Sequence, residues 1–337
     1  MLLVAAQEGV TALAHERLAE LSAPCPELLR SRLAQAARQA SALSLLVQSE
    51  TRRILDALSK AGLSTLLLKG SALAYWLYPT PQLRECGDID LLLASRDDAE
   101  KASSILQSLG YQRREAHLPG DLVTFEFTCV LDGGIFPGLE VDIHWRLSSS
   151  PIYAFHFDND ELWASAQPLP RLSGTARGLS RLHAYQHACL HRMLNIPGRM
   201  QDTLKWLNDI HLLGKQFSPT DWQLLIIDAR KRGLAGTCLH GLVAAEDCFG
   251  AVAPAHVEME LAAAARSESM DVGQMSKWLY LQRLSFLAFP TWRDRIRWLR
   301  QRLVPDWNYL VDFYGKDTSA IGLLGQRLAG GWKRLVR

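Results

Sequence analysis

Hydrophobic residues in the first 60 positions recur with the three-to-four-residue spacing of helices. The stripe is clearest between residues 38 and 60, and its members are Leu43, Leu46, Val47, Ile54, Leu55 and Leu58. Gly62 follows soon afterwards, and a glycine just past the last turn is a common helix end. The pattern therefore predicts a helical N-terminal segment that ends before residue 63.

From residue 63 the pattern changes to short apolar runs separated by helical stretches. Strands are predicted at residues 64–68, 89–93, 122–131 and 139–147. Helices are predicted at residues 72–78, ended by Pro79 and Pro81, and at 97–109, between Ser95 as N-cap and Gly110. This order predicts a small α/β domain with a mixed sheet.

Beyond residue 161 no strand pattern is recognisable. Helices are predicted at residues 180–195, 201–214, 220–232, 234–248 and 275–287. The segment 151–178 is rich in Pro, Ser and Gly and is a candidate linker. We therefore expect a sheet-containing domain over residues 1–150, a linker over 151–178 and a helical C-terminal domain over 179–337.

The overall charge is nearly balanced, because the net charge of the 337 residues is +2. Bulk charge thus points to neither nucleic acid nor a membrane. Residues 291–337 are locally basic and contain Trp292, Trp298, Trp307 and Trp332. Such a stretch binds RNA or an anionic membrane surface in some proteins, and more often packs its aromatic face on the domain.

Cysteine usage and hydropathy indicate the compartment. The six cysteines form no C-x-x-C pair, which is typical of reduced thiols in a cytosolic protein. No apolar stretch approaches the roughly 20 residues of a membrane-spanning helix, and no basic segment precedes the mildly apolar N-terminus. We expect a cytoplasmic protein without a membrane span.

Two acidic residues, Asp88 and Asp90, lie at the start of the apolar run 89–93. Because side chains alternate along a strand, both carboxylates point to one face, while Ile89 and Leu91 point to the other. Adjacent carboxylates repel one another unless a cation lies between them. The pair therefore predicts a divalent-metal site, with Mg²⁺ or Mn²⁺ as the expected ion.

A third carboxylate, Asp142, fits the same site. It shares one strand face with Glu140 and His144, and the residues between them are apolar. A neighbouring strand would bring Asp142 beside the first pair, and three carboxylates can hold two metal ions against a nucleoside triphosphate. The alternative for these acidic residues is a solvated position at a strand end or a helix cap.

The segment before the acidic pair carries residues suited to phosphate. Gly70 and Ser71 lie where a strand gives way to a helix, and a glycine allows the backbone to approach an anion at the helix N-terminus. The Ser71 hydroxyl and the Lys69 amine are further candidate contacts, and Arg84 would neutralise the leaving pyrophosphate. Alternatively, Lys69 is a solvated strand-end lysine and Arg84 belongs to a surface salt bridge.

Taken together, Lys69-Gly70-Ser71, the Tyr-Pro pair at 78–79, Arg84 and the run 88–92 resemble a known family. This is the uncharacterised bacterial nucleotidyltransferase family of the polymerase-beta-like superfamily. Further similarity lies in residues 183–191 and 206–210, so that the likeness spans roughly residues 35 to 215. The gap between the Gly-Ser pair and the acidic pair is longer than in the best-known superfamily members.

The resemblance implies an α/β (α+β) fold, with a small mixed-sheet nucleotidyltransferase domain followed by an all-helical domain. Asp88, Asp90 and Asp142 would be the catalytic metal ligands, and the segment around Gly70 and Ser71 would hold the triphosphate. The implied reaction transfers a nucleoside monophosphate from an NTP, with ATP as the expected nucleotide, to an acceptor hydroxyl. The acceptor is a small molecule, a peptide, a protein or RNA.

Two alternatives to this function stay open. One is a toxin-like nucleotidyltransferase that modifies tRNA, which would require RNA and arrest growth on expression. The other is a non-catalytic assembly protein, in which the acidic residues bind a nucleotide without turnover. Only a turnover assay separates the second alternative from an enzyme.

The predicted helix over residues 180–195 carries His183, His187 and His191 at four-residue spacing, so that they share one face. A His-x-x-x-His pair can bind zinc, but the Glu of the metalloprotease motif is absent. We therefore expect no zinc here. The face would be packed in the interior or would line the nucleotide cleft.

Lys205 and Asp209 on the next predicted helix lie four residues apart. They would form an ordinary i,i+4 ion pair, or they would face the cleft together with His187 and His191.

Overall fold

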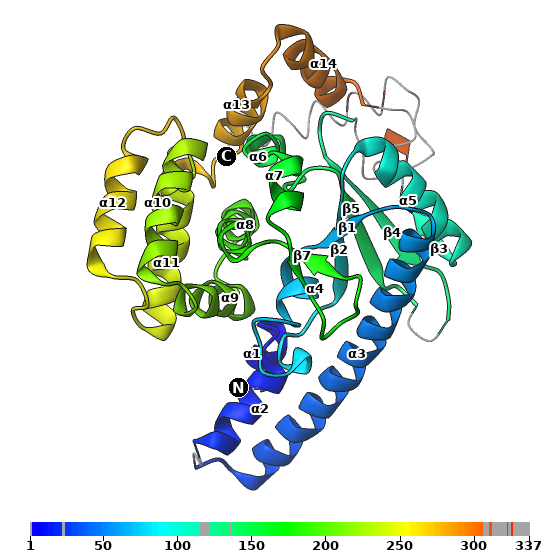
Figure 1. Ribbon diagram of the computed structural model, residues 1–337, viewed down its shortest axis with the longest axis vertical. Helices are drawn as coiled ribbons and strands as arrows, with labels where there is room; N and C mark the ends of the chain where they lie inside the picture. The colour runs from blue at the N-terminus through cyan, green and yellow to red at the C-terminus, as the bar shows by residue number, and fades with distance from the viewer. Residues whose placement is uncertain are drawn as a thin grey trace.

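The computed structural model describes residues 2–21, 24–114, 121–134 and 137–305, together with residues 310, 311, 322 and 325. These residues form a seven-stranded mixed sheet with helices around it and a helical C-terminal part. Figure 1 shows the sheet on one side of the molecule and most of the later helices on the other. The α/β class with a mixed sheet and a helical C-terminal region, expected from the sequence, is confirmed.

Three helices precede the sheet: α1 (Leu2–Gln7), α2 (Thr11–Glu20) and α3 (Glu27–Lys60). The predicted apolar stripe lies on α3, where Ile54 and Leu58 are fully buried. Gly62 has a φ of +75°, in the left-handed region that glycine adopts without a steric penalty. The chain can therefore leave α3 in a sharp turn and enter the first strand.

The strands are β1 (Thr65–Leu67), β2 (Asp88–Leu93), β3 (Tyr111–Arg113), β4 (Glu126–Leu131), β5 (Glu140–His144), β6 (Gln167–Pro168) and β7 (Arg177–Gly178). The first helices between strands are α4 (Lys69–Leu73) and α5 (Arg96–Ser108). The strand order is β3-β4-β5-β2-β1-β7-β6. Central β2 runs parallel to β5 and antiparallel to β1, and β4 runs antiparallel to β5.

Three strands lie where the sequence predicted none, namely β3, β6 and β7. β6 and β7 form an antiparallel pair, and β7 joins the sheet through a parallel pairing of Gly178 with Leu67. The expectation of no strand beyond residue 161 is therefore wrong, because two-residue strands are too short to show an alternating pattern. The segment 151–178 also contains α6 (Pro151–Ala154) and α7 (Asn159–Ala164), so the structure builds this segment into the fold.

The two faces of the sheet belong to different hydrophobic cores. Leu91 of β2 joins the core formed with α3 and α5. Leu92 and Leu66, on the opposite face, join a core that continues into the C-terminal helices. Asp88 and Asp90 alternate with Leu91 and therefore lie on the face toward the helical part.

The C-terminal helices are α8 (Arg181–Leu194), α9 (Leu204–Lys215), α10 (Pro219–Arg232), α11 (Ala235–Phe249), α12 (Ala255–Ala265), α13 (Trp278–Ala288) and α14 (Trp292–Leu303). α8 packs against α9 and α11, and it reaches the sheet domain through α4. The alanine-rich α12 was not predicted, because its sequence lacks a distinct apolar stripe. In the described part of the chain, no helix combines the length and apolarity needed to cross a membrane.

Of the two tryptophans that the structure describes in the basic C-terminal stretch, one lies in the interior. Trp298 of α14 is buried in the core shared with α3 and α5, whereas Trp292 is 67% exposed. Trp307 and Trp332 lie outside the described residues. The packing interpretation of this stretch is therefore confirmed for Trp298.

Candidate active site

Three ligand-bearing side chains converge on β2 and β5. The parallel register places Asp90 directly opposite Asp142. His144, two residues further along β5, shares their face because of strand alternation. One ligand atom from each of Asp90, Asp142 and His144 lies within 4.8 Å of the others. The predicted meeting of the two acidic strands is thus present for Asp90 and Asp142.

His144 is a site residue to which sequence reasoning assigned no role. Its side chain is buried, with Nε2 3.2 Å from Asp90 Oδ1 and Nδ1 3.2 Å from Glu126 Oε2. Glu126 lies on β4, directly across from His144 in the register. The available signal was the shared face of His144 and Asp142, but sequence alone does not show that this face meets Asp90.

Asp88 lies at the edge of this group. It is exposed at the first residue of β2, opposite Glu140 in the register, and is not among the three converging side chains. The charge of Asp90 raises the pKa of the Asp88 carboxyl. Asp88 therefore borders the site on its solvent side, where its carboxylate is accessible.

The charges in the site are strongly coupled. Burial raises the pKa of Asp142 to about 6, the charge of Asp90 acts in the same direction, and Thr128 Oγ1 donates a hydrogen bond of 2.7 Å to Asp142 Oδ1. Burial also acts to raise the pKa of Asp90, but Lys69 and His144 hold it well below its usual range. Paired carboxylates with an adjacent imidazole suit a divalent cation, since Mg²⁺ prefers oxygen ligands and imidazole suits several transition metals.

Lys69 supplies the positive charge beside Asp90. Its Nζ donates to Asp90 Oδ1 at 2.7 Å. The backbone of Lys69 has a φ of +47°, an uncommon conformation for a residue with a side chain. This conformation turns the chain from β1 directly into α4, which therefore spans Lys69–Leu73 and not residues 72–78 as predicted.

Gly70 and Ser71 lie inside the first turn of α4. The Ser71 hydroxyl donates to the Leu68 carbonyl at 2.8 Å and accepts from the Asp90 backbone N–H at 3.2 Å. A Cβ on Gly70 would lie 2.7 Å from Cys86 Sγ and 2.8 Å from Arg84 Nη1. In this structure both residues therefore support the contact between α4 and the start of β2.

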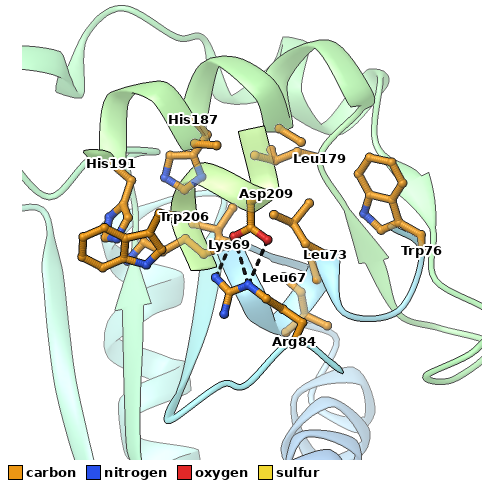
Figure 2. A pocket seen from close by; sticks show the side chains of 14 residues that line it. Leu67, Lys69, Leu73, Trp76, Arg84, Leu179, His187, His191, Trp206 and Asp209 are labelled. Atoms are coloured by element: carbon orange, nitrogen blue, oxygen red, sulfur yellow. Dashed lines mark hydrogen bonds and ion pairs between the residues drawn. The ribbon is translucent and has the colours of Figure 1, made fainter. Parts of the chain in front are cut away.

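Arg84 forms a buried ion pair with Asp209 of α9. Its Nε donates to Asp209 Oδ1 at 2.9 Å, and its Nη2 donates to Asp209 Oδ2 at 2.7 Å. The Tyr78 hydroxyl donates to Asp209 Oδ1 at 2.7 Å and accepts from Asn208 Nδ2 at 3.0 Å. Figure 2 shows Arg84 and Asp209 facing each other across the junction between the two parts of the chain.

Lys205 does not pair with Asp209 and instead packs its aliphatic stem against Gly9. A Cβ on Gly9 would lie 2.6 Å from Lys205 Cδ. The carboxylate of Asp209 is engaged by Arg84 and Tyr78. The structure therefore joins Asp209 to the sheet domain by an interaction that the i,i+4 interpretation did not anticipate.

A small cavity lies beside Lys69, between α4 and the helices α8 and α9 (Figure 2). Its polar lining includes Lys69, Arg84, His187, His191, Trp206 and Asp209. The space for centres of water-sized molecules is about 30 Å³, which is too little for a nucleotide without movement of side chains. The predicted cleft-lining positions of His187, His191 and Asp209 are thus brought together around this cavity.

The three histidines of α8 lie in two different environments. Burial lowers the pKa of His187 to about 3 and that of His191 well below its usual value, so both imidazoles are neutral near pH 7. The His191 ring lies edge-on to Trp206, with centroids 4.5 Å apart. His183 instead lies 3.1 Å from the hydroxyls of Ser165 and Ser180.

Comparison with known protein families shows a match. The profile of a family described as "uncharacterised nucleotidyltransferase" matches residues 1–250, which include the sheet, the acidic site and α8 to α11. No curated protein matches the chain in sequence.

Proposed function

The chain belongs to this nucleotidyltransferase family, and on that premise we propose that it transfers a nucleoside monophosphate from an NTP to an acceptor hydroxyl, releasing pyrophosphate. The observation that carries the proposal is the convergence of Asp90, Asp142 and His144 on one face of the sheet. We further propose that the family belongs to the polymerase-beta-like superfamily, with bacterial members.

Asp90 and Asp142 would hold the divalent ion. His144 offers a third ligand atom, within 4.8 Å of a carboxylate oxygen of each of them. Asp88, exposed beside them, would contribute the ligand for a second ion together with Asp90. The bound Mg²⁺ or Mn²⁺ ions would neutralise the developing charge on the transferred phosphoryl group and lower the pKa of the acceptor hydroxyl.

The protein's own groups would orient the reactants. Asp142 would accept the proton of the acceptor hydroxyl, since its carboxylate lies on the site face directly opposite Asp90. Lys69 would bind the triphosphate, since its ammonium is at the site face next to Asp90. Gly70 and Ser71 would act at the triphosphate through the first turn of α4, which the Ser71 hydroxyl ties to the Asp90 N–H of β2. Arg84 would act there through its ion pair with Asp209, which borders the same cavity as Lys69.

We propose ATP as the preferred nucleotide and a small molecule, peptide, protein or RNA as the acceptor. A cytoplasmic reaction agrees with the six free cysteines. We also propose that the catalytic domain covers residues 1–150 and the helical domain residues 179–337, with the segment between them joining the two.

The proposal is tested by incubating the purified protein with Mg²⁺ or Mn²⁺, NTPs labelled at the α-phosphate, and cell extract. We expect transfer of the label with release of pyrophosphate, and essentially complete loss of transfer in Asp90→Asn and Asp142→Asn. Asp56→Asn, an exposed position on α3, is the matched control that keeps wild-type transfer.

Two results would count against the proposal, and a third would specify its biological use. Label transfer that survives Asp90→Asn would remove the acidic site from the chemistry. Tight NTP binding without pyrophosphate release would favour the non-catalytic alternative. Transfer only to tRNA, accompanied by growth arrest on expression, would favour the toxin-like alternative.

A further inference from the structure

Lys69 and His144, the latter a candidate metal ligand, both contact the same carboxylate oxygen of Asp90. Nζ of Lys69 lies 2.7 Å from Asp90 Oδ1, and the same oxygen lies 3.2 Å from Nε2 of His144. A Mg²⁺ ion ligated by this oxygen would lie about 2.0–2.1 Å from it. The ammonium and such an ion would therefore crowd and repel each other.

The backbone at this position indicates that the location of the ammonium matters. Lys69 adopts a φ of +47°, although a residue without a Cβ would adopt it more easily. Residues held in sparsely populated conformations occur most often at functional sites. The strained turn directs the Lys69 side chain toward Asp90, and the Ser71 hydroxyl ties the same turn to the Asp90 N–H.

Lys69 has acidic groups on its sheet side and neutral imidazoles on its cavity side. Burial acts to lower the pKa of Lys69, but the charges of Asp90, Asp88 and Glu126, all on the sheet, raise it. On its other side lies the small cavity between α4 and α8, lined by the imidazoles of His187 and His191. The carboxylate of Asp209, which also borders that cavity, is occupied by Arg84. Asp90 is therefore the direct anionic partner of the ammonium until a ligand brings another anion.

We propose that Lys69 is a built-in counter-ion that competes with the divalent cation for Asp90 and is drawn away by the triphosphate of the incoming NTP. This inference rests on the proposed nucleotidyltransferase function. Its consequence is positive coupling: the cation binds weakly alone and tightly together with the nucleotide. The site then assembles its metal only when substrate is present.

The test measures Mn²⁺ binding by electron paramagnetic resonance of the free ion, first without nucleotide. We expect Lys69→Met to bind Mn²⁺ about tenfold more tightly than wild type, or better, because losing a charge-assisted hydrogen bond frees Asp90. Lys69→Arg keeps the positive charge and should bind as weakly as wild type. Lys60→Met, an exposed lysine at the end of α3, is the matched control and should leave Mn²⁺ affinity unchanged.

The second measurement adds an ATP analogue with a methylene bridge between the α and β phosphorus atoms. Relative to the same nucleotide and Mn²⁺ without protein, wild type should then gain about tenfold or more in Mn²⁺ affinity. Lys69→Met should gain much less, since it has no ammonium for the triphosphate to draw away from Asp90. Lys69→Gly is a second neutral variant for the case that Lys69→Met folds poorly. Glycine adopts a φ of +47° without strain, so this variant should keep the turn.

Equal Mn²⁺ affinity of wild type and both neutral variants, without nucleotide, would overturn the counter-ion proposal. That result is separable from failure of the proposed function. Tighter Mn²⁺ binding in Lys69→Met and Lys69→Gly, in a protein that transfers no label from any NTP, would support the competition and refute the enzymatic function. Label transfer together with equal Mn²⁺ affinities of wild type and both variants would support the enzymatic function and refute the competition.

Discussion

Removal of the Asp209 carboxylate should destabilise the protein strongly, because it leaves the Arg84 guanidinium buried without its anionic partner. The two side chains are 5% and 4% exposed and share a bidentate contact with bonds of 2.7–3.0 Å. Breaking a buried pair from one side costs about 3–5 kcal/mol. The Tyr78 hydroxyl would also lose its acceptor, which keeps the expected loss for Asp209→Ala within or above that range.

A double variant separates the loss of a partner from the loss of the pair. In Arg84→Met/Asp209→Leu both charges are replaced by apolar groups of similar volume, so that no unpaired charge remains in the interior. Such replacements are often neutral or stabilising. We expect the double variant to recover most of the stability lost in Asp209→Ala, with a remaining deficit from the Tyr78 hydroxyl.

The assay is urea unfolding followed by circular dichroism, compared at equal denaturant slope. The control is Glu20→Ala, which removes an exposed partner of Arg17 and should cost less than about 1 kcal/mol. A loss below about 1 kcal/mol for Asp209→Ala, or a double variant weaker than the single one, would refute the reasoning. The Arg84–Asp209 pair would then not be what joins α9 to the sheet domain.

Two further predictions concern single side chains. Ser71→Ala should lower the free energy of unfolding by about 1–3 kcal/mol, because the buried Asp90 N–H loses its acceptor; an unchanged melting temperature would show that this N–H is satisfied in another way. His187, whose pKa is lowered to about 3 by burial, stays neutral in the folded state while the unfolded state takes up a proton below pH 6.5. The free energy of unfolding therefore decreases as the pH falls below about 6.5, with a slope that approaches about 1.4 kcal/mol per pH unit. His187→Gln should flatten the fall in unfolding free energy between pH 6 and pH 4, and an identical pH slope in both proteins would contradict the buried neutral imidazole.

The sequence determined those features that depend on neighbours along the chain. Alternation with a period of two assigned Asp88 and Asp90 to one strand face and Asp142 to another polar face, because side-chain direction in a strand is a local property. The Ser95 N-cap was also readable, and its hydroxyl accepts from the Asp98 N–H at 3.1 Å. The family resemblance added the nucleotidyltransferase assignment, which the family match supports.

The tertiary structure decided which of these faces and charges meet. The pairing of Asp90 with Asp142 depends on the register between β2 and β5, and that register brings His144 into the site. The partner of Arg84 is Asp209, 125 positions away, so that no local pattern could distinguish it from a phosphate ligand. Pairings of this kind depend on how the helical part packs on the sheet, since only tertiary packing brings residues so far apart in the chain into contact and buries their charges.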